Sequence, residues 1–368
     1  MHLTRLEIGG LRCFERADFA PAPGLNLITG GNGSGKTSLL EALHLMAYGR
    51  SFRGRVRDGL VRAGSSAVEV FVEWRETATG RLRRAGLRHG GQSWEGRLDG
   101  MPLAQLGDLC AALAVVTFEP GSHALVMGSA EPRRRFLDWG LFHVEPEFLP
   151  LWRRYARALK QRNSLLKVRT RDRQLDAWEH ELASAGTPLT QHRERYLEQL
   201  QPYLRAASAE LLPAAGSSDL QFLPGWRRDE LSLADALLLA RDRDLVAGFT
   251  SVGPHRADWR IEHAAIPGRE ALSRGQAKLT ALSALLAQAE HQAGLRGEWP
   301  IVALDDLASE LDRSHQALVL RRLRGYGAQV LVTGTEPPAG FVGMSTAPYM
   351  FHVEQGRIIA EGQASASA

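Results

Sequence analysis

Residues 25–43 read LNLITGGNGSGKTSLLEAL, and this stretch decides the fold. The apolar run 25–28 has the character of a short buried strand, and the run 39–43 continues a helix whose first turn contains Lys36 and Thr37. Between them lies a turn rich in glycine. A strand, a glycine turn and a helix in this order leave the free N–H groups of the helix N-terminus facing the turn, which favours binding of an anion there.

The turn fits the pattern G-x-x-x-x-G-K-[ST], which is typical of nucleotide-binding loops. In this pattern the backbone amides surround the β-phosphate, the lysine reaches the β- and γ-phosphate oxygens, and the threonine hydroxyl binds Mg²⁺. The alternative is a structural turn that carries a lysine by chance, but both flanking elements that the motif requires are present. We predict that ATP and Mg²⁺ are bound by Gly30, Gly31, Asn32, Gly33, Ser34, Gly35, Lys36, Thr37 and Ser38.

The use of lysine supports this prediction. Of the 45 basic residues only four are lysine, so the chain uses arginine in nearly every other basic position. A compact ammonium fits between phosphate oxygens where a planar guanidinium does not. We therefore expect Lys36 to act in catalysis as well as in binding.

Length and composition limit the class of protein. A chain of 368 residues predicts two domains, or three, and the 44% hydrophobic content is ordinary for a globular protein. Two cysteines are too few for a disulfide framework, which favours a reducing compartment. The first residues lack the apolar core of a signal peptide, and no run approaches the ~18 apolar residues of a membrane span. We expect a cytoplasmic protein without a membrane partner.

A second motif lies near the end of the chain, where the apolar strand 301–304 is followed by two carboxylates. This is the form of a Walker B element, in which Asp305 holds Mg²⁺ and Asp306 orients the attacking water. Paired carboxylates at a strand end can also be a simple solvent cap, but the P-loop in the same chain favours the catalytic interpretation.

A third motif precedes a long apolar helix over residues 279–293. Ser273, Gly275 and Gln276 form a turn that opens the helix, which makes a second anion-binding N-terminus. Such a turn does not easily reach the nucleotide held by the P-loop of its own chain. We expect it to cap a nucleotide bound to a second copy, so that ATP joins two chains.

The order of the motifs predicts the domain organisation. Lys36 and Asp305 must reach one nucleotide, so both ends of the chain are expected to build one α/β unit, a mixed sheet flanked by helices. We predict this head over residues 1–129 and 245–361, a helical insert over 130–244, and a disordered tail over 362–368.

Two basic segments are candidates for DNA contact. The loop after the P-loop helix contains Arg50, Arg53, Arg55 and Arg57 without an acid, although it can equally be a solvated loop. Residues 131–175 contain 12 basic and 5 acidic side chains, beginning with Arg133, Arg134 and Arg135, and aromatic residues are interleaved. This charge either serves solubility or binds DNA.

Several motifs together carry a resemblance to a known family. The P-loop, the turn 272–276, the strand end 301–306 and the segment 309–312 resemble the ABC-type ATPase heads of SMC and related DNA-maintenance proteins. The runs SFR at 51–53, RRRFLD at 133–138 and GPHR at 253–256, with the short insert, resemble the RecF family of bacterial recombination mediators more closely. The resemblance covers residues 1–360.

The resemblance implies an ABC-type P-loop ATPase head with an inserted α-helical arm. It further implies binding to single- and double-stranded DNA, dimerisation with ATP, and slow hydrolysis that serves as a dimerisation switch. RecO- and RecR-type mediators are the implied partners in placing RecA at gaps, which supports replication, recombinational repair and the SOS response. It assigns Ser273 and Asp312 to the nucleotide of a second chain.

The sequence departs from most such heads at three places. Asp306 stands where most carry glutamate, Gly334-Thr335 stands in place of a switch histidine, and Glu119-Pro120-Gly121 follows Phe118 without a glutamine. The alternatives are an SMC-like structural ATPase, a small-molecule kinase, which has no use for the Ser273 turn, and a transporter subunit, which needs a membrane partner.

Overall fold

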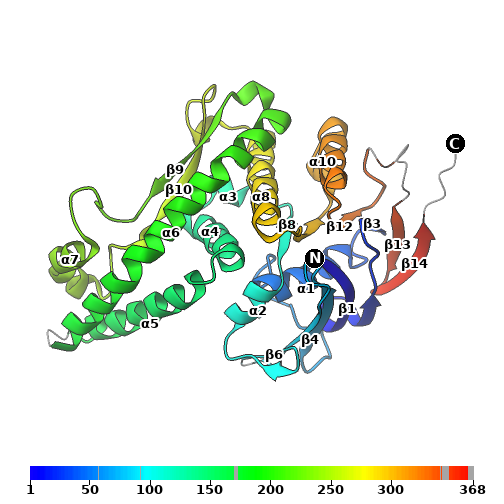
Figure 1. The fold of residues 1–368 in the computed structure, drawn as a ribbon. Helices are drawn as coiled ribbons and strands as arrows, with labels where there is room; N and C mark the ends of the chain where they lie inside the picture. The colour runs from blue at the N-terminus through cyan, green and yellow to red at the C-terminus, as the bar shows by residue number, and fades with distance from the viewer. Residues whose placement is uncertain (57, 92, 170–172, 340, 342–347, 364–368) are drawn as a thin grey trace. The chain divides into compact units, whose positions relative to one another are not determined.

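The structure is a computed structural model that describes residues 1–56, 58–91, 93–169, 173–339, 341 and 348–363. The chain divides into two compact units, whose elements are labelled in Figure 1. Unit 1 contains residues 1–123, 210–213 and 273–368, and unit 2 contains residues 124–209 and 214–272. Both ends of the chain thus contribute to unit 1.

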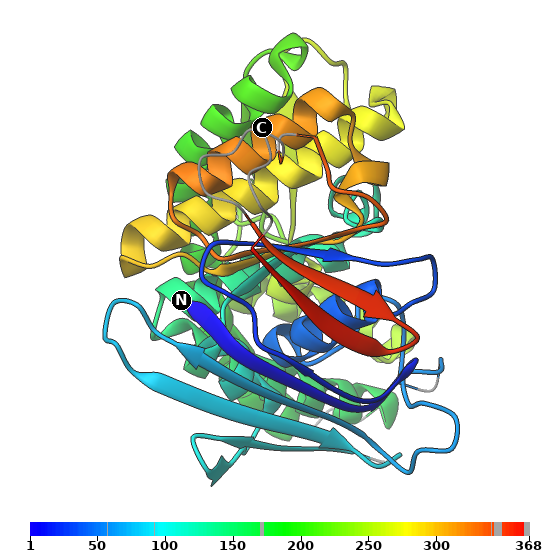
Figure 2. The same ribbon diagram turned by 90° about the vertical axis from the view of Figure 1, so that its right-hand side faces the viewer.

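Unit 1 contains two six-stranded sheets. The first is antiparallel, with the order β2-β1-β4-β5-β6-β7. Its strands are β1 (His2–Leu11), β2 (Phe14–Phe19), β4 (Val68–Arg75), β5 (Leu82–His89), β6 (Trp94–Leu98) and β7 (Met101–Pro102). Burial alternates along β4, as expected for a sheet with one face on the core. These strands are drawn in blue and cyan in Figure 2.

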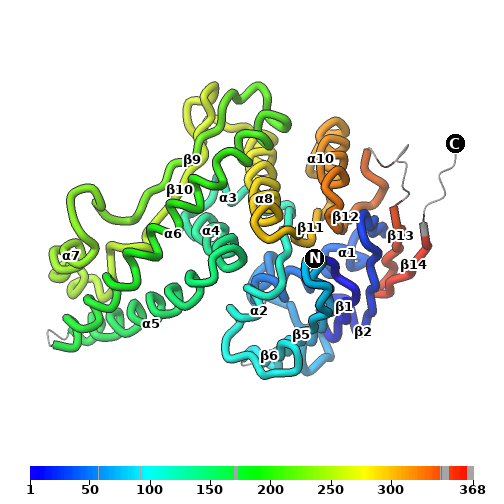
Figure 3. Tube along the Cα trace, in the orientation of Figure 1, coloured from blue at the N-terminus to red at the C-terminus, as the bar shows by residue number. Residues whose placement is uncertain are grey.

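The second sheet has the order β14-β13-β3-β12-β11-β8 and is parallel except for the β13–β14 pair. Its strands are β3 (Leu25–Thr29), β8 (Val115–Phe118), β11 (Ile301–Leu304), β12 (Val330–Gly334), β13 (Tyr349–Glu354) and β14 (Arg357–Gln363). Strands β8, β11 and β12 are buried along their whole length. Figure 3 shows β3 from the start of the chain beside β13 from its end.

Helix α1 (Lys36–Tyr48) contacts β1 and β4 of the first sheet and β8 and β12 of the second. Its apolar side chains are buried on all sides, as a helix between two sheets requires. The other helices of unit 1 are α2 (Leu106–Ala112), α8 (Arg274–Arg296), α9 (Leu307–Glu310) and α10 (Arg313–Gly325). The predicted α/β head with a mixed sheet and flanking helices is confirmed.

Unit 2 is mostly helical and also contains a two-stranded sheet. Its elements are α3 (Ala124–Met127), α4 (Ala130–Val144), α5 (Phe148–Lys167), α6 (Arg173–Leu211), α7 (Leu233–Ala247), β9 (Ser218–Leu223) and β10 (Asp258–His263), with short 3₁₀ turns at Pro213–Ala215, Pro254–Arg256 and Arg269–Ala271. The last two residues of α6 belong to unit 1. Strand β10 pairs with β9.

Two boundaries differ from the sequence prediction. Residues 245–272 were expected in the head but belong to unit 2, because β10 finds its hydrogen-bonding partner in β9. Gly362 and Gln363 were expected in the tail but end β14, where Gln363 pairs with Tyr349. The rest of the predicted tail, 364–368, lies outside the described residues.

The long helix α6 contains two prolines in its interior. The pair Thr187-Pro188 has the pattern of a helix start, yet α6 continues through Pro188 and Pro202. Buried Leu182, Ala185 and Leu189 hold this part of the helix by packing, which outweighs the lost backbone hydrogen bond. Among the described residues, no helix is long and apolar enough to cross a membrane.

Candidate functional site

The glycine loop between β3 and α1 has the conformation that its sequence predicts. Gly30 and Gly35 adopt φ values of 152° and 124°, which favour glycine. A Cβ atom at Gly30 would lie 2.3 Å from the carbonyl oxygen of Val353, and one at Gly35 would lie 2.8 Å from Cys13 Sγ. Gly31, Asn32 and Gly33 are exposed. The loop can therefore close around a ligand only without side chains at these two positions.

Lys36 lies in the concave side of this loop. Its Nζ donates to the carbonyl oxygens of Gly30 (2.7 Å) and Gly31 (2.9 Å). Burial lowers the pKa of Lys36, while the charges of Asp306 and Asp305 act in the opposite direction. The ammonium is thus held where phosphate oxygens would approach the loop.

Ser34 provides a further test of the fit to a phosphate. Its hydroxyl oxygen is buried and has no hydrogen-bond partner among the described residues. A buried hydroxyl without a partner costs free energy unless a ligand or water satisfies it. Next to the loop amides and Lys36, this hydroxyl fits a phosphate oxygen.

Three side chains meet at the carboxyl ends of the parallel strands. Asp305 Oδ1 accepts hydrogen bonds from the hydroxyls of Thr37 (3.1 Å) and Thr333 (2.7 Å), and its residue is 1% exposed. Burial raises the pKa of Asp305, and the two hydrogen bonds oppose this rise. A hydroxyl beside a carboxylate is an all-oxygen donor set that suits Mg²⁺. Thr37 and Asp305 are the residues that would hold this ion.

Asp306 follows directly and adopts a left-handed conformation with φ 52°. Its N–H donates to the hydroxyl of Thr333 (2.9 Å). Thr333 therefore bonds to both residues of the acidic pair. Thr335, which stands in place of a switch histidine, is exposed, whereas Thr333 is the threonine that bonds to the acidic pair.

Glu119 lies at the end of β8, next to the end of β11. Phe118 pairs with Leu304, and the N–H of Asp305 donates to the carbonyl of Phe118 (2.8 Å). Burial raises the pKa of Glu119 and the charge of Asp305 raises it further, against a hydrogen bond from Gly121. A carboxylate thus stands where the sequence analysis looked for a glutamine.

A pocket of about 410 Å³ opens over the loop and the first turn of α1. Arg12 and Arg53 contribute to its wall, and the buried carboxylate of Glu41 holds both, at 2.8 and 3.7 Å. The Ser51 hydroxyl donates to the same carboxylate (2.5 Å). The pocket is lined by Arg12, Cys13, Gly33, Gly35, Lys36, Thr37, Ser38, Arg53 and Gly59.

This pocket changes the interpretation of Arg53, which was considered for DNA contact but lies beside the P-loop. Arg50 and Arg55 are exposed, so both stay available for such a contact. Burial nevertheless lowers the pKa of Arg50. Arg57 lies outside the described residues.

The turn before α8 has the predicted geometry. Ser273 is the N-cap of α8, and its hydroxyl accepts from the N–H of Gln276 (3.2 Å) while the Gln276 side chain accepts from the N–H of Ser273 (2.9 Å). This reciprocal capping box fixes the start of the helix. Ser273 and Gly275 are exposed, so the helix N-terminus is accessible.

Asp312 is the N-cap of α10 and is exposed. Its carboxylate accepts from the N–H groups of Ser314 and His315 (both 3.0 Å) and pairs with His315 Nδ1 (2.5 Å). Hydrogen bonds from Ser314 and His315 hold the pKa of Asp312 well below its usual range. The carboxylate predicted to contact a second chain is therefore used to cap its own helix.

The three consecutive arginines of α4 have different surroundings. Arg133 is 3% exposed and donates from Nε to Asp258 (2.6 Å) and from Nη1 to the backbone carbonyls of 125, 126 and 128. This burial contradicts the predicted contact of Arg133 with DNA. The Arg133 side chain instead holds β10 to α4. Arg134 is half-buried, and exposed Arg135 pairs with Glu131 one turn earlier.

Known proteins are similar to this chain over nearly its whole length. Residues 2–358 match the model of the RecF/RecN/SMC N terminal domain. The chain is 66% identical over 363 residues to the DNA replication and repair protein RecF of Stenotrophomonas maltophilia, covering 98% of this chain and 100% of the relative. The chain belongs to the RecF family. The protein of the same name from Thioalkalivibrio sulfidiphilus is 40% identical over 358 residues, covering 97% of this chain and 99% of that relative.

Solved structures agree with the family assignment. The recombination mediator protein RecF-ATP in the RecFOR pathway has a TM-score of 0.86 at 25% identity, covering 98% of this chain and 97% of that one. An Smc head bound to the C-winged helix domain of ScpA has a TM-score of 0.61 at 16% identity, covering 99% and 98%. The latter shows the fold alone, and both agree with an ABC-type head.

Sequence reasoning missed two members of this site, Thr333 and Glu41, and it named Glu119 only as a residue that stands where a glutamine was expected. Thr333 and Glu119 each end a strand beside β11, but the order of strands in a parallel sheet cannot be read from one chain. Glu41 carried a signal, since a carboxylate inside an apolar helix run needs partners when it is buried. Arg12 and the basic loop after α1 supply them.

Proposed function

We propose that this chain binds Mg²⁺-ATP at the P-loop, closes into a dimer of two copies with the nucleotides between them, and binds DNA during replication and recombinational repair. Hydrolysis is slow and opens the dimer. The partners expected by family are RecO- and RecR-type mediators and RecA at single-strand gaps, in support of the SOS response. A cytoplasmic location is part of the same proposal.

The observation that carries ATP binding is the hydrogen bond between Thr37 and Asp305. This bond joins the P-loop to the strand end at Asp305, although the two residues are 268 positions apart in the sequence. It places a hydroxyl and a carboxylate side by side. When bound, Mg²⁺ would neutralise charge on the phosphates. Lys36 and the loop amides bind and orient the phosphates. Asp306, which directly follows Asp305, orients the attacking water. The RecF-ATP relative supports this assignment.

The exposed N-terminus of α8 supports the dimer. Ser273 and Gly275 are exposed, and helix N-termini attract phosphates. Slow hydrolysis follows from Asp306, whose side chain is one methylene shorter than the glutamate of most ABC heads. DNA binding rests on the names of the relatives and on exposed arginines such as Arg50 and Arg55.

Sedimentation velocity with and without Mg²⁺-ATP tests the proposal. Lys36→Ala removes the ammonium and is expected to abolish both ATP binding and the ATP-dependent dimer. Ser273→Arg is expected to keep ATP binding to the monomer while the added bulk and charge block the dimer. Ser273→Ala loses the same helix cap without bulk and serves as the control for folding, since such a cap contributes about 1 kcal/mol. An ATP-driven dimer of Lys36→Ala would overturn the proposal.

A further inference from the structure

Four arginines of unit 2 differ in the groups that they bond to. Arg133 donates to both oxygens of Asp258 (2.6 and 3.1 Å), and Arg193 of α6 donates to both oxygens of Asp138 (2.8 to 3.0 Å). These two arginines are 3% exposed. Arg133 and Arg193 bond to both oxygens of these carboxylates, and their role is to hold unit 2 together.

The other two arginines, Arg134 and Arg256, bond to backbone carbonyls instead. Nη1 of Arg134 donates to the carbonyl of Ala257 (2.8 Å), and Arg256 donates to the carbonyl of Thr250 (3.1 and 3.3 Å). Neither forms an ion pair with a carboxylate among the described residues. Burial lowers the pKa of Arg134, and the charge of Arg193 lowers it further, while the charges of Asp258 and Asp138 raise it and that of Arg256 lowers it. The guanidinium of Arg134 is thus repelled by those of Arg193 and Arg256.

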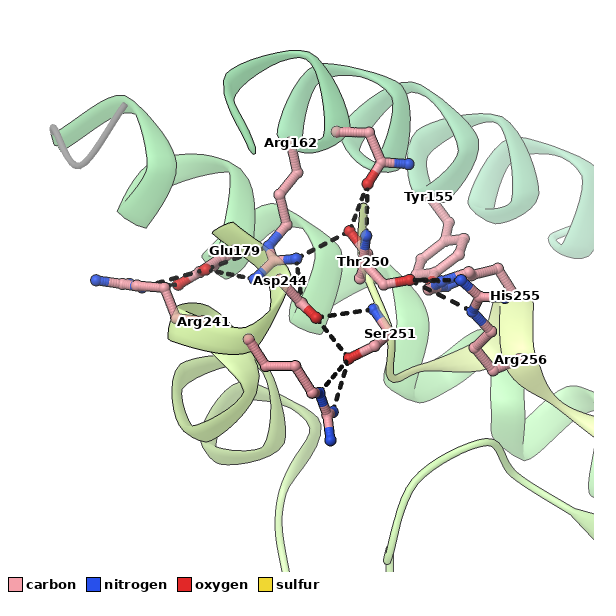
Figure 4. A network of polar contacts seen from close by, with 11 residues as sticks. Tyr155, Arg162, Glu179, Arg241, Asp244, Thr250, Ser251, His255 and Arg256 are labelled. Carbon is pink, nitrogen blue, oxygen red and sulfur yellow. Dashed lines mark hydrogen bonds and ion pairs between the residues drawn. The ribbon is translucent and has the colours of Figure 1, made fainter. Parts of the chain in front are cut away.

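The segment that presents Arg256 is rigidly supported. Figure 4 shows His255 and Arg256 meeting at the carbonyl of Thr250, with Tyr155 behind His255. The Thr250 hydroxyl accepts from buried Arg162 (2.9 Å) and donates to Asn163 (2.7 Å). The guanidinium of Arg256 also lies 5.1 Å over the ring of Phe249. A fixed guanidinium loses little conformational freedom when it binds an anion.

We propose that Arg134 and Arg256 together form a binding site for backbone phosphates of DNA, and that Arg133 and Arg193 only support it. The inference rests on the DNA binding proposed above and names the groups that perform it. The exposed guanidinium of Arg256 and the half-buried one of Arg134 form no ion pair among the described residues, and both bond to carbonyls of the segment 250–257. Such a pair matches a phosphodiester, which accepts charge-assisted hydrogen bonds. Contacts to phosphate are independent of base sequence.

The test is the salt dependence of binding to a fluorescent duplex, measured by anisotropy with Mg²⁺-ATP. Arg134→Gln and Arg256→Gln remove the charge and keep an N–H group for the carbonyls of Ala257 and Thr250. Each is expected to reduce the slope of log K against log salt by about 0.9, and the double variant by about 1.8. Arg256→Lys keeps the charge and is expected to keep the slope. Arg135→Gln, at an exposed and ion-paired neighbour, is the control.

The outcomes separate this inference from the proposed function. If the wild-type protein does not bind the duplex at all, the DNA-binding proposal itself fails. If the wild type binds and the double Gln variant, with an unchanged melting temperature, retains the wild-type slope, the phosphate site is wrong while DNA binding stands. A change in the slope for Arg135→Gln as large as that of the pair would overturn the assignment, because the effect would then not be specific to Arg134 and Arg256.

Discussion

Replacing Thr333 by valine tests whether one hydroxyl positions both acidic residues of the site. Thr333 is 1% exposed at the end of β12, and its hydroxyl bonds to Asp305 Oδ1 and to the N–H of Asp306. Valine has nearly the same shape, so the packing is kept and only the two hydrogen bonds are lost. Asp305 keeps the bond from Thr37, but the left-handed conformation of Asp306 loses its support.

The expected loss of stability follows from these bonds. A hydrogen bond to a charged group contributes about 1.5–3 kcal/mol and a neutral one about 1 kcal/mol, so we expect a loss of about 3 kcal/mol. For a unit of this size, that lowers the melting temperature by about 6–12 °C. Because the P-loop is unchanged, the affinity for ATP should change little. The kcat of ATP hydrolysis should fall about a hundredfold, since misplacing a catalytic group by about 1 Å has an effect of this order.

The assay combines thermal unfolding, ATP affinity by calorimetry and steady-state hydrolysis. Thr333→Ser restores the hydroxyl without the methyl group and should return kcat to near the wild-type value. Wild-type kcat in Thr333→Val would refute the positioning role, even if the melting temperature falls. A fall in ATP affinity as large as the fall in kcat would show instead that Thr333 supports the P-loop.

Two further predictions concern stability. Arg133→Leu leaves the partly buried Asp258 without its partner and should reduce the free energy of unfolding by about 3–5 kcal/mol in urea titrations, whereas the exposed Arg135→Leu should change it by less than about 0.5 kcal/mol. Burial lowers the pKa of His44 from 6.5 to about 3. Below pH 6.5 the unfolded chain therefore binds a proton at His44 that the folded chain does not bind. The free energy of unfolding is highest above pH 6.5 and falls as the pH drops toward 3. The stability difference between wild type and His44→Gln should change by about 1 kcal/mol between pH 7.5 and 5.5, and a constant difference would contradict the burial argument.

Local motifs were the part of the site that the sequence could predict. The P-loop and the Walker B strand end are each read from a few consecutive residues, because a glycine conformation or a strand-end carboxylate depends on near neighbours. Thr333 could not be found in this way. It bonds to Asp305 because β12 lies between β3 and β11, and this strand order is set by the packing of the whole sheet.

Counting charge over a segment could not separate arginines that are available to a phosphate from structural ones. The excess of positive charge over residues 131–175 includes Arg133 and Arg162, which are buried on carboxylates elsewhere in the chain. Asp258 and Asp244 lie outside the counted window, so the window overstates the free charge. Only partners distant in sequence distinguish a structural arginine from one that is available to a phosphate.

The corrected domain boundary changes how the arm relates to the head in the chain. A boundary at 245 would place a long stretch of head between the insert and the α8 turn. The observed boundary lies between Leu272 and Ser273, so the residue that caps α8 is the first residue of the head after the arm. The capping box needs the backbone of Ser273 to be extended and its N–H to reach Gln276. The cap of the proposed dimer contact is therefore one of the places where the head is joined directly to the arm by a single peptide bond.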